Sequence, residues 1–160
     1  MIENIIDTSN TTQETTIEQA SIDNAATDTA EETSIVYLPD DYLANGYYAT
    51  TDTGIKYLRP EFVGKYAEIM AALLADMKPS DFNGLIREMR RCKKSNQPFE
   101  VCFTVAVELI PKSLQLIHRH KAPALLVTFI KHNIDNIHED MNDWMAFYRH
   151  LEAVAAFMEI

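Results

Sequence analysis

The residues with the most chemistry to offer lie in the stretch 87–94, where five of eight positions carry Lys or Arg. On a helix, at about 100° per residue, four of these cations share one face. They are Arg87, Arg90, Arg91 and Lys94. Apolar residues occupy the opposite face, namely Phe82, Leu85, Met89 and Cys92. A stripe of guanidinium and ammonium groups binds phosphate oxygens without reading bases. The alternative is a solvated face whose cations suit the carboxyl end of the helix.

Five further cations lie near the ends of expected helices. Two of them, Lys56 and Arg59, precede a long segment with apolar periodicity. The other three flank the segment between two prolines, and they are Lys112, Arg119 and Lys121. Each is an ordinary surface charge when taken alone. Together they extend the predicted phosphate-binding surface, although spacing does not show that their helices share a face.

The elements that must position these cations begin after an acidic segment. The chain has 160 residues and a formal net charge of −10. Residues 1–45 hold ten Asp and Glu but no Lys or Arg, so the remainder holds fourteen of each sign. Such a polar segment buries too little apolar surface to offset its ordering entropy. We therefore predict a disordered acidic tail over 1–45, a linker over 46–55 and a helical domain over 56–160.

Apolar residues recur every three or four positions after residue 56, which predicts helices. We expect them over about 58–77, over 81–94 with Ser80 as N-cap, from Pro98 through Leu109, from Pro123 to about Ile137, and through Trp144 to Met158. Pro111 must kink or end the third helix because it lacks an N–H. No segment alternates with period two for long enough to predict a strand. The sequence thus indicates an all-α bundle of about five helices. The wide apolar band of the last helix is either core or a subunit interface.

Cysteine content and hydropathy indicate the compartment. Cys92 and Cys102 fall among apolar residues, which is typical of inert core thiols in a reduced, cytoplasmic protein. No apolar run approaches the roughly 18 residues that a bilayer span requires. We therefore expect a cytoplasmic protein that does not contact a membrane.

The remaining reactive residues do not match known catalytic or metal-binding patterns. His118 and His120 point to different sides of a helix, and the two cysteines are ten positions apart. The chain has four glycines, none of them clustered, so it lacks a Gly-rich phosphate loop. We expect no metal, no cofactor and no catalytic residue, and we predict that the protein is not an enzyme.

Three segments carry a family resemblance. "FIKHNIDNIHEDMNDWMAFYRHLEAVAAFM", 129–158, resembles the ending of the small helical subunit of type III-A CRISPR effector complexes, the Csm complexes. "YLR", 57–59, and "LIPKSLQLIHR", 109–119, are similar to the start of that family's first core helix and to its middle helix. The resemblance covers about residues 56 to 158. The chain departs from the family at Leu116–His120 and at Phe157 and Met158, and it carries an additional acidic tail.

The resemblance implies a non-catalytic subunit that stacks in several copies along the duplex of guide RNA and target RNA. Its partners would be both RNAs, through their backbones, further copies of itself in a filament, and the other subunits of the Csm complex. By position, the resemblance assigns RNA contacts to Lys56, Arg59, Lys112 and Arg119. A helical protein–protein adaptor, with an N-terminal docking tail around "VYLPDDYL", is the alternative function.

Overall fold

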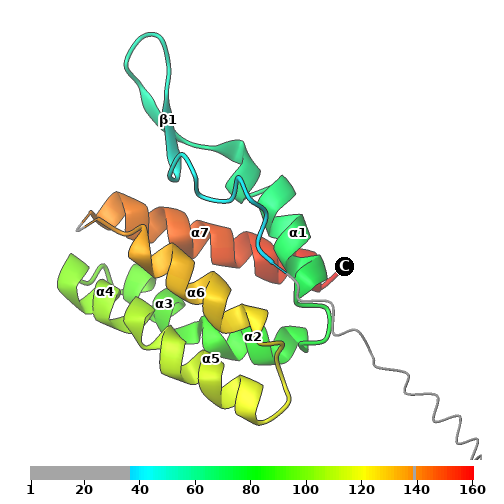
Figure 1. Cartoon of the computed structure of the whole chain (residues 1–160). Coiled ribbons are helices and arrows are strands. Elements are labelled where there is room, and N and C mark those ends of the chain that lie inside the picture. Colours follow the sequence, from blue (N-terminus) through cyan, green and yellow to red (C-terminus); the bar gives the residue numbers. More distant parts are fainter. Residues whose placement is uncertain (1–36, 139) are drawn as a thin grey trace, which may run out of the picture. The chain divides into compact units, whose positions relative to one another are not determined.

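The computed structural model describes residues 37–138 and 140–160 (Figure 1). The elements follow one another as β1 Tyr48–Thr50, β2 Lys56–Leu58, the 3₁₀ helix η1 Pro60–Phe62, α1 Lys65–Leu73, α2 Pro79–Leu85, α3 Arg87–Lys94, α4 Phe99–Val107, α5 Leu109–His118, α6 Leu125–Asp135 and α7 Met141–Met158. The predicted all-α bundle is confirmed. Single residues separate α2 from α3 and α4 from α5. If each pair is joined, the described part of the chain contains five helical rods.

Prolines set two helix starts that differ from the prediction. The first long helix begins at Lys65 rather than near residue 58, because Pro60 opens a separate short turn of 3₁₀ helix. The second helix begins with Pro79 at its first position and Lys78 as its N-cap, rather than with Ser80 as the cap. Proline is well suited to the first helical position, where its missing N–H has no intrahelical partner to lose.

A small β-hairpin, which the sequence analysis did not predict, precedes the helices. β1 and β2 pair antiparallel, with Tyr48 opposite Leu58 and Ala49 opposite Tyr57. Each strand has three residues, which is too short for alternation to be recognised. Gly54 has a φ of 83° in the turn, a conformation that side chains of L-residues disfavour. Figure 1 shows the hairpin projecting beyond the helices.

The predicted start of the folded domain at residue 56 is wrong. Tyr42, Leu43 and Tyr47 are buried in the core, so the residues described from 37 onward belong to the folded domain rather than to a tail or linker. This segment consists of turns, so it has no periodicity that would reveal it. The remainder of the predicted tail, 1–36, lies outside the described residues.

Helix α7 organises the core. It packs against α1, α2 and α4, and Trp144, Phe147 and Leu151 on it are fully buried. The apolar band of the last helix is therefore core. Trp144 Nε1 also donates a hydrogen bond of 2.8 Å to the carbonyl of Cys102 on α4. Burial raises the pKa of Cys102 to about 11, so its thiol is protonated at neutral pH.

A buried polar cluster joins the N-terminal segment to α6 and η1. Asn133 Oδ1 accepts hydrogen bonds from the hydroxyls of Tyr42 at 3.0 Å and Tyr47 at 2.8 Å. His150 Nδ1 donates to the carbonyl of Phe62, while its Nε2 has no hydrogen-bond partner among the described residues. Burial lowers the pKa of His150 to about 4, although the bond to Phe62 acts in the opposite direction. The imidazole is therefore neutral at pH 7.

Helices α4 and α5 form the most apolar long segment described. By length and composition alone, Phe99–His118 meets the criterion for a membrane span, with a mean hydropathy of 1.3 over 18 residues. The sequence analysis expected no such segment. This is weak evidence for a membrane, because core helices meet the same criterion and because Glu108 and Lys112 carry charges on it. The absence of membrane contact stays a prediction.

Candidate nucleic-acid interface

Three of the predicted cations meet in one groove between α2–α3 and α5. Arg87 lines it from the start of α3, Lys112 lines it from α5, and Arg119 lines it from the C-cap of α5. The cavity measures about 290 Å³ and also contacts Asp81 and Gln115. We call it the basic groove. The expectation that cations distant in sequence share a surface is thus met for these three residues.

Local sequence explains why the groove exists. On α5 and its C-cap, three polar residues follow at spacings of three and four, so they lie on the same side of the helix: Lys112, Gln115 and Arg119. On the opposite wall, Gly84 lies beside Arg87: a Cβ added at Gly84 would be in ordinary contact with the Arg87 Nη2 atom, at 3.9 Å. The contact between α2 and α5 brings the two walls together.

The charges lining the basic groove are unbalanced. Three cations face the single carboxylate of Asp81. Lys112 Nζ lies 3.1 Å from Glu108 Oε2, one helical turn away, but such exposed pairs contribute little and yield readily to a stronger partner. Arg87 and Arg119 are exposed and form no ion pair with any residue that the structure describes. An anion would therefore find uncompensated positive charge here.

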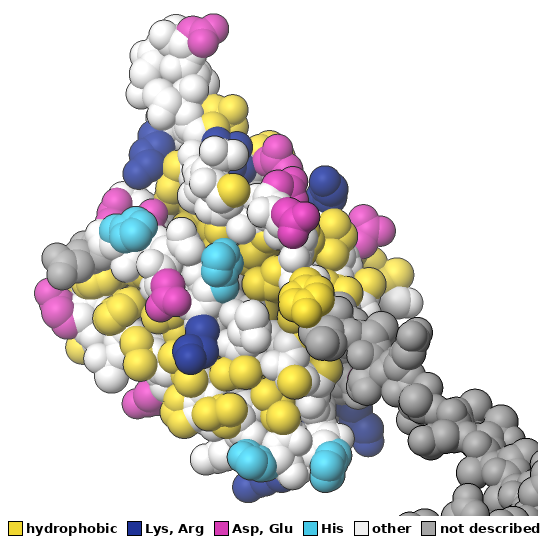
Figure 2. Space-filling view, viewed as in Figure 1, with side chains coloured by type: hydrophobic (Ala, Val, Ile, Leu, Met, Phe, Trp, Pro, Cys, Tyr) yellow, Lys and Arg dark blue, Asp and Glu magenta, His cyan; other side chains and the backbone are white. Residues whose placement is uncertain are grey.

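A second groove of about 390 Å³ continues the basic one. The two share Ser80 and Asp81, and the second is also lined by Lys78, His120 and Lys121. Lys121 Nζ donates to Asp81 Oδ1 at 3.3 Å. Figure 2 shows basic and histidine side chains gathered around the connection between α5 and α6. The carboxylates of Asp76 and Asp81 face the two lysines of this second groove, so it adds no net positive charge to the basic groove.

Arg90 does not belong to this surface. Its Nε lies 2.7 Å from Glu152 Oε1 on α7, and its Nη2 donates to Asn83 Oδ1 at 2.7 Å. The hydrogen bond to Glu152 raises the pKa of Arg90 above its ordinary value. Arg90 thus connects α3 to α7. The four cations of the predicted stripe therefore do not form one surface, because their surroundings differ.

The two remaining cations of the stripe are exposed. Arg91 Nη1 contacts Glu88 Oε1 at 2.9 Å, three residues earlier on the same helix. Lys94 lies at the carboxyl end of α3 and forms no ion pair with a described residue. Neither lines the basic groove. The solvated-face explanation suits both, because their charges also complement the helix terminus.

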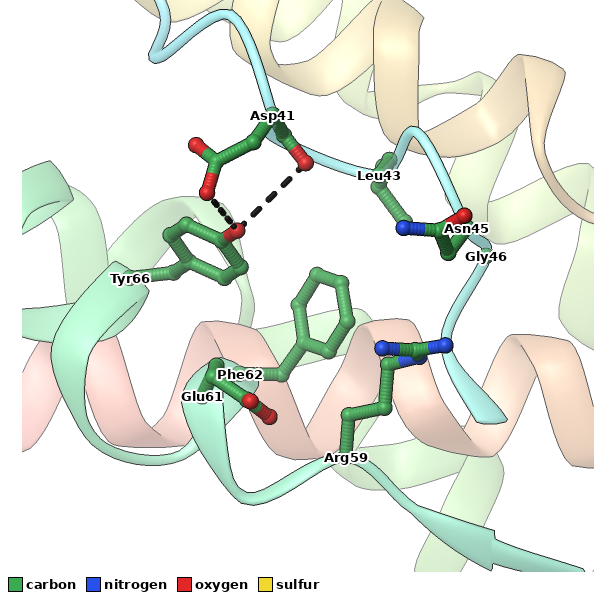
Figure 3. A pocket seen from close by; sticks show the side chains of 8 residues that line it. All are labelled: Asp41, Leu43, Asn45, Gly46, Arg59, Glu61, Phe62 and Tyr66. Atoms are coloured by element: carbon green, nitrogen blue, oxygen red, sulfur yellow. Dashed lines mark hydrogen bonds between the residues drawn. The ribbon is translucent and has the colours of Figure 1, made fainter. Parts of the chain in front are cut away.

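Lys56 and Arg59 lie elsewhere, on the hairpin: Lys56 pairs with Thr50 next to the turn, and Arg59 follows β2 at the base. The Lys56 ammonium lies 4.6 Å from the centroid of the Tyr48 ring, and Arg59 Nε donates to the carbonyl of Tyr48 at 3.3 Å. Figure 3 shows the Arg59 guanidinium pointing into a cavity of about 180 Å³. Asp41 and Glu61 also line this cavity. Two carboxylates beside one guanidinium make it a poor site for phosphate.

The sequence analysis missed Gln115 and Lys78. The signal for Gln115 was present, since it lies between Lys112 and Arg119 at helical spacing. Lys78 has no such signal, because its neighbour Lys121 is 43 positions later and only the fold brings their grooves together.

Comparison with known proteins gives no relative. No protein-family model, no curated protein and no solved structure matches this chain.

Proposed function

We propose that this protein is a non-catalytic small subunit of a type III-A CRISPR RNA-guided effector complex, a Csm complex, and acts in antiviral defence in the cytoplasm. Several copies would stack along the duplex of guide RNA and target RNA and contact its backbone. The observation that carries the proposal is the basic groove, where Arg87, Lys112 and Arg119 converge from two helical segments. The sequence resemblance over about residues 56 to 158 supplies the assignment to the complex.

The lining of the basic groove suits a sugar–phosphate backbone better than bases. None of its nine lining residues is aromatic, whereas proteins that hold unpaired bases stack them on aromatic rings. Cations bind phosphates whatever the sequence. Such indifference is appropriate where base pairing with a guide already selects the target, since the protein must then accept every sequence.

Charge reversal in the basic groove tests the proposal. Fluorescence anisotropy would measure binding of the full chain to two labelled RNA duplexes of unrelated sequence. Wild-type protein should bind both with similar affinity. The triple variant R87E/K112E/R119E should bind each about 100-fold more weakly, because three phosphate contacts become repulsive.

The matched control changes the same total charge outside the groove. The triple variant R91E/K94E/K131E replaces three exposed cations on α3 and α6. It should weaken binding far less than the groove variant. Equal losses in the two variants would show a response to net charge alone, and the proposed site would then be rejected.

The alternative, an adaptor that docks through "VYLPDDYL", gains no support from the structure. Tyr42 and Leu43 of that segment are buried in the chain's own core, and the Tyr42 hydroxyl is bonded to Asn133. A docking peptide must present its apolar side chains to a partner. Here two of them are already used within the fold.

A further inference from the structure

The cavity beside Arg59 is lined by opposite charges that do not pair with each other. It measures about 180 Å³, and we call it the mixed-charge cavity. Asp41 lines it from the N-terminal segment, and Arg59 and Glu61 line it from η1 and its N-cap. None of the three forms an ion pair with a residue that the structure describes. Opposite charges that share one cavity but stay apart leave room between them for a ligand.

The Arg59 side chain is held so that its guanidinium faces this cavity. It is half-buried, and its Nε donates to the carbonyl of Tyr48 at 3.3 Å. The backbone N–H of Arg59 donates to the carbonyl of Tyr47 at 2.9 Å. No hydrogen bond joins the guanidinium to another of the lining residues (Figure 3). Its two terminal nitrogens therefore face the cavity in the fork geometry that binds a carboxylate at two points.

Asp41 is held on the other side of the mixed-charge cavity. Figure 3 shows Asp41 and Tyr66 on one side of the Phe62 ring and Arg59 on the other. The Tyr66 hydroxyl donates to Asp41 Oδ2 at 2.8 Å. Burial and this bond raise the pKa of Tyr66, so the hydroxyl stays a donor at neutral pH. A carboxylate accepts up to about four hydrogen bonds, so Asp41 can still accept from a ligand.

A tight turn fixes the wall that carries Asp41 and Asn45. The N–H groups of Ala44 and Gly46 donate to the carbonyls of Asp41 at 3.2 Å and Leu43 at 2.9 Å. Leu43 has a φ of 60°, which is unfavourable for a bulky side chain. Its side chain is buried in the core, and that burial offsets the backbone strain. The two sides of the cavity are therefore already in place without a ligand.

A ligand that lies between these groups must carry both charges. A simple anion would be repelled by Asp41 and Glu61, and a simple amine would be repelled by Arg59. A zwitterion suits both sides, because its carboxylate meets the guanidinium and its ammonium group meets a carboxylate. The volume of about 180 Å³ equals that of about six water molecules in the liquid. This size suits an α-amino acid with a short side chain, which Phe62 and Leu43 can contact.

We propose that the mixed-charge cavity binds a small free α-amino acid. Arg59 binds the carboxylate of the ligand at two points, and Asp41 accepts hydrogen bonds from its ammonium group. The ligand thereby joins the N-terminal segment to η1 and stabilises the folded protein. This inference goes beyond the proposed function, since the cavity shares no lining residue with the basic groove.

Thermal denaturation of the full chain with matched probes tests the proposal. The probe is L-alanine, and the matched compounds are propionate, which lacks its ammonium group, and ethylamine, which lacks its carboxylate. At equal ionic strength, alanine should raise the melting temperature in a saturable way, with half-saturation near about 1 mM. Propionate and ethylamine should bind at least about tenfold more weakly, because each loses a charge-assisted contact.

Substitutions locate the binding. Arg59→Met and Asp41→Asn each remove one charge of the cavity and keep a side chain of similar size. Each should weaken alanine binding at least about tenfold. The matched controls, Arg149→Met and Asp40→Asn, change exposed residues that do not line the cavity and should keep the wild-type affinity.

Nuclear magnetic resonance with isotope-labelled glycine gives a readout that does not depend on melting. Gly46 lines the mixed-charge cavity and Gly84 lines the basic groove. Alanine should shift the Gly46 amide signal in a saturable way and leave the Gly84 signal in place.

Four results would overturn the site. They are a wild-type chain that does not respond to alanine, an equal response to alanine and ethylamine or propionate, wild-type affinity in Arg59→Met and Asp41→Asn, and a rise in melting temperature that stays linear with concentration in every variant. The last would be the general stabilisation that an excluded solute produces. None of them bears on RNA binding by the basic groove. Conversely, an unaffected RNA affinity in R87E/K112E/R119E would reject the proposed function and leave the amino-acid site standing.

Discussion

Arg87 and Arg90 lie one turn apart on α3, yet their surroundings differ completely. Arg90 is bonded to Glu152 and Asn83 and joins α3 to α7. Arg87 faces α5 across the basic groove and forms no ion pair with a described residue. A cation that is paired within the fold, such as Arg90, contributes to the stability of the folded protein. A charge that the fold leaves unsatisfied, beside two others of the same sign, indicates a partner.

The same distinction holds for the molecule's two polar regions. Around Asn133 the hydroxyls of Tyr42 and Tyr47 are bonded within the core. In the basic groove Arg87 and Arg119 are exposed, Lys112 is half-exposed, and only Lys112 forms an ion pair with a described residue. Substitutions in the first region should change the free energy of unfolding, and substitutions in the second should change RNA affinity.

The largest effect is expected from Asn133→Leu. The substitution leaves the buried Tyr42 hydroxyl without an acceptor and leaves the Tyr47 hydroxyl only the backbone carbonyl of residue 133, at 3.3 Å. The free energy of unfolding should fall by about 3 kcal/mol. Urea denaturation measures this loss. RNA affinity, taken at a temperature where the variant is folded, should remain within about twofold of wild type. A large loss of affinity in the folded variant would show that the two regions are coupled.

The second prediction concerns His150 and pH. Its pKa is about 4 in the folded protein and 6.5 in the unfolded chain, so the unfolded chain takes up the proton first as the pH falls. The stabilising effect of the neutral imidazole is complete above pH 6.5 and is lost as the pH falls toward 4. Between pH 7 and pH 5 the loss should be about 2 kcal/mol.

Urea denaturation at the two pH values measures the His150 contribution. His150→Leu should show a smaller decrease than wild type over that interval. His138→Gln, at an exposed histidine, should show the wild-type decrease. If His150→Leu keeps the full decrease, another group causes it.

The third prediction separates the two arginines directly. Arg90→Ala should lower the free energy of unfolding by about 1 kcal/mol, because the half-exposed Glu152 loses a two-point partner. Arg87→Ala should change it by less than about 0.5 kcal/mol. RNA affinity should respond in the opposite order. An Arg87→Ala protein as destabilised as Arg90→Ala would mean that Arg87 also serves the fold.

The smallest effect is expected at Gly84. Gly84→Ala should raise the free energy of unfolding by about 0.5 to 1 kcal/mol, since glycine is unfavourable inside a helix and a Cβ meets only the Arg87 side chain at 3.9 Å. Affinity for RNA should be almost unchanged. Gly84→Phe should fill the basic groove and reduce affinity without unfolding the protein, as thermal denaturation would verify.

Periodicity predicted most of the fold. The five helical rods follow from apolar residues at spacings of three and four, and Pro98 directly precedes Phe99, the first residue of α4. Periodicity failed for Tyr42 and Tyr47, which lie in turns and in a hairpin of three-residue strands. Their burial depends on a hydrogen-bond acceptor, the side chain of Asn133, which lies about 90 positions later in the sequence. No local pattern contains that information.

The candidate site was predictable only in part. Charge and helical spacing identified Arg87 but gave Arg90 the same role, while Lys112 and Arg119 were identified by their charge near helix ends and by the family resemblance. The carboxylate of Glu152, 62 positions later, decides that Arg90 serves the fold. Which charges face a cation depends on which helices pack together. That packing belongs to the tertiary structure and cannot be read from the spacing of residues in the sequence.

The most direct test of the central claim is the salt dependence of RNA binding. For wild type, the logarithm of the affinity should fall linearly with the logarithm of salt concentration, because bound phosphates release counterions. Arg87→Ala, Lys112→Ala and Arg119→Ala should each reduce the magnitude of that slope by about one, and Arg91→Ala should leave it unchanged. If the three groove variants keep the wild-type slope, the basic groove does not bind the RNA backbone.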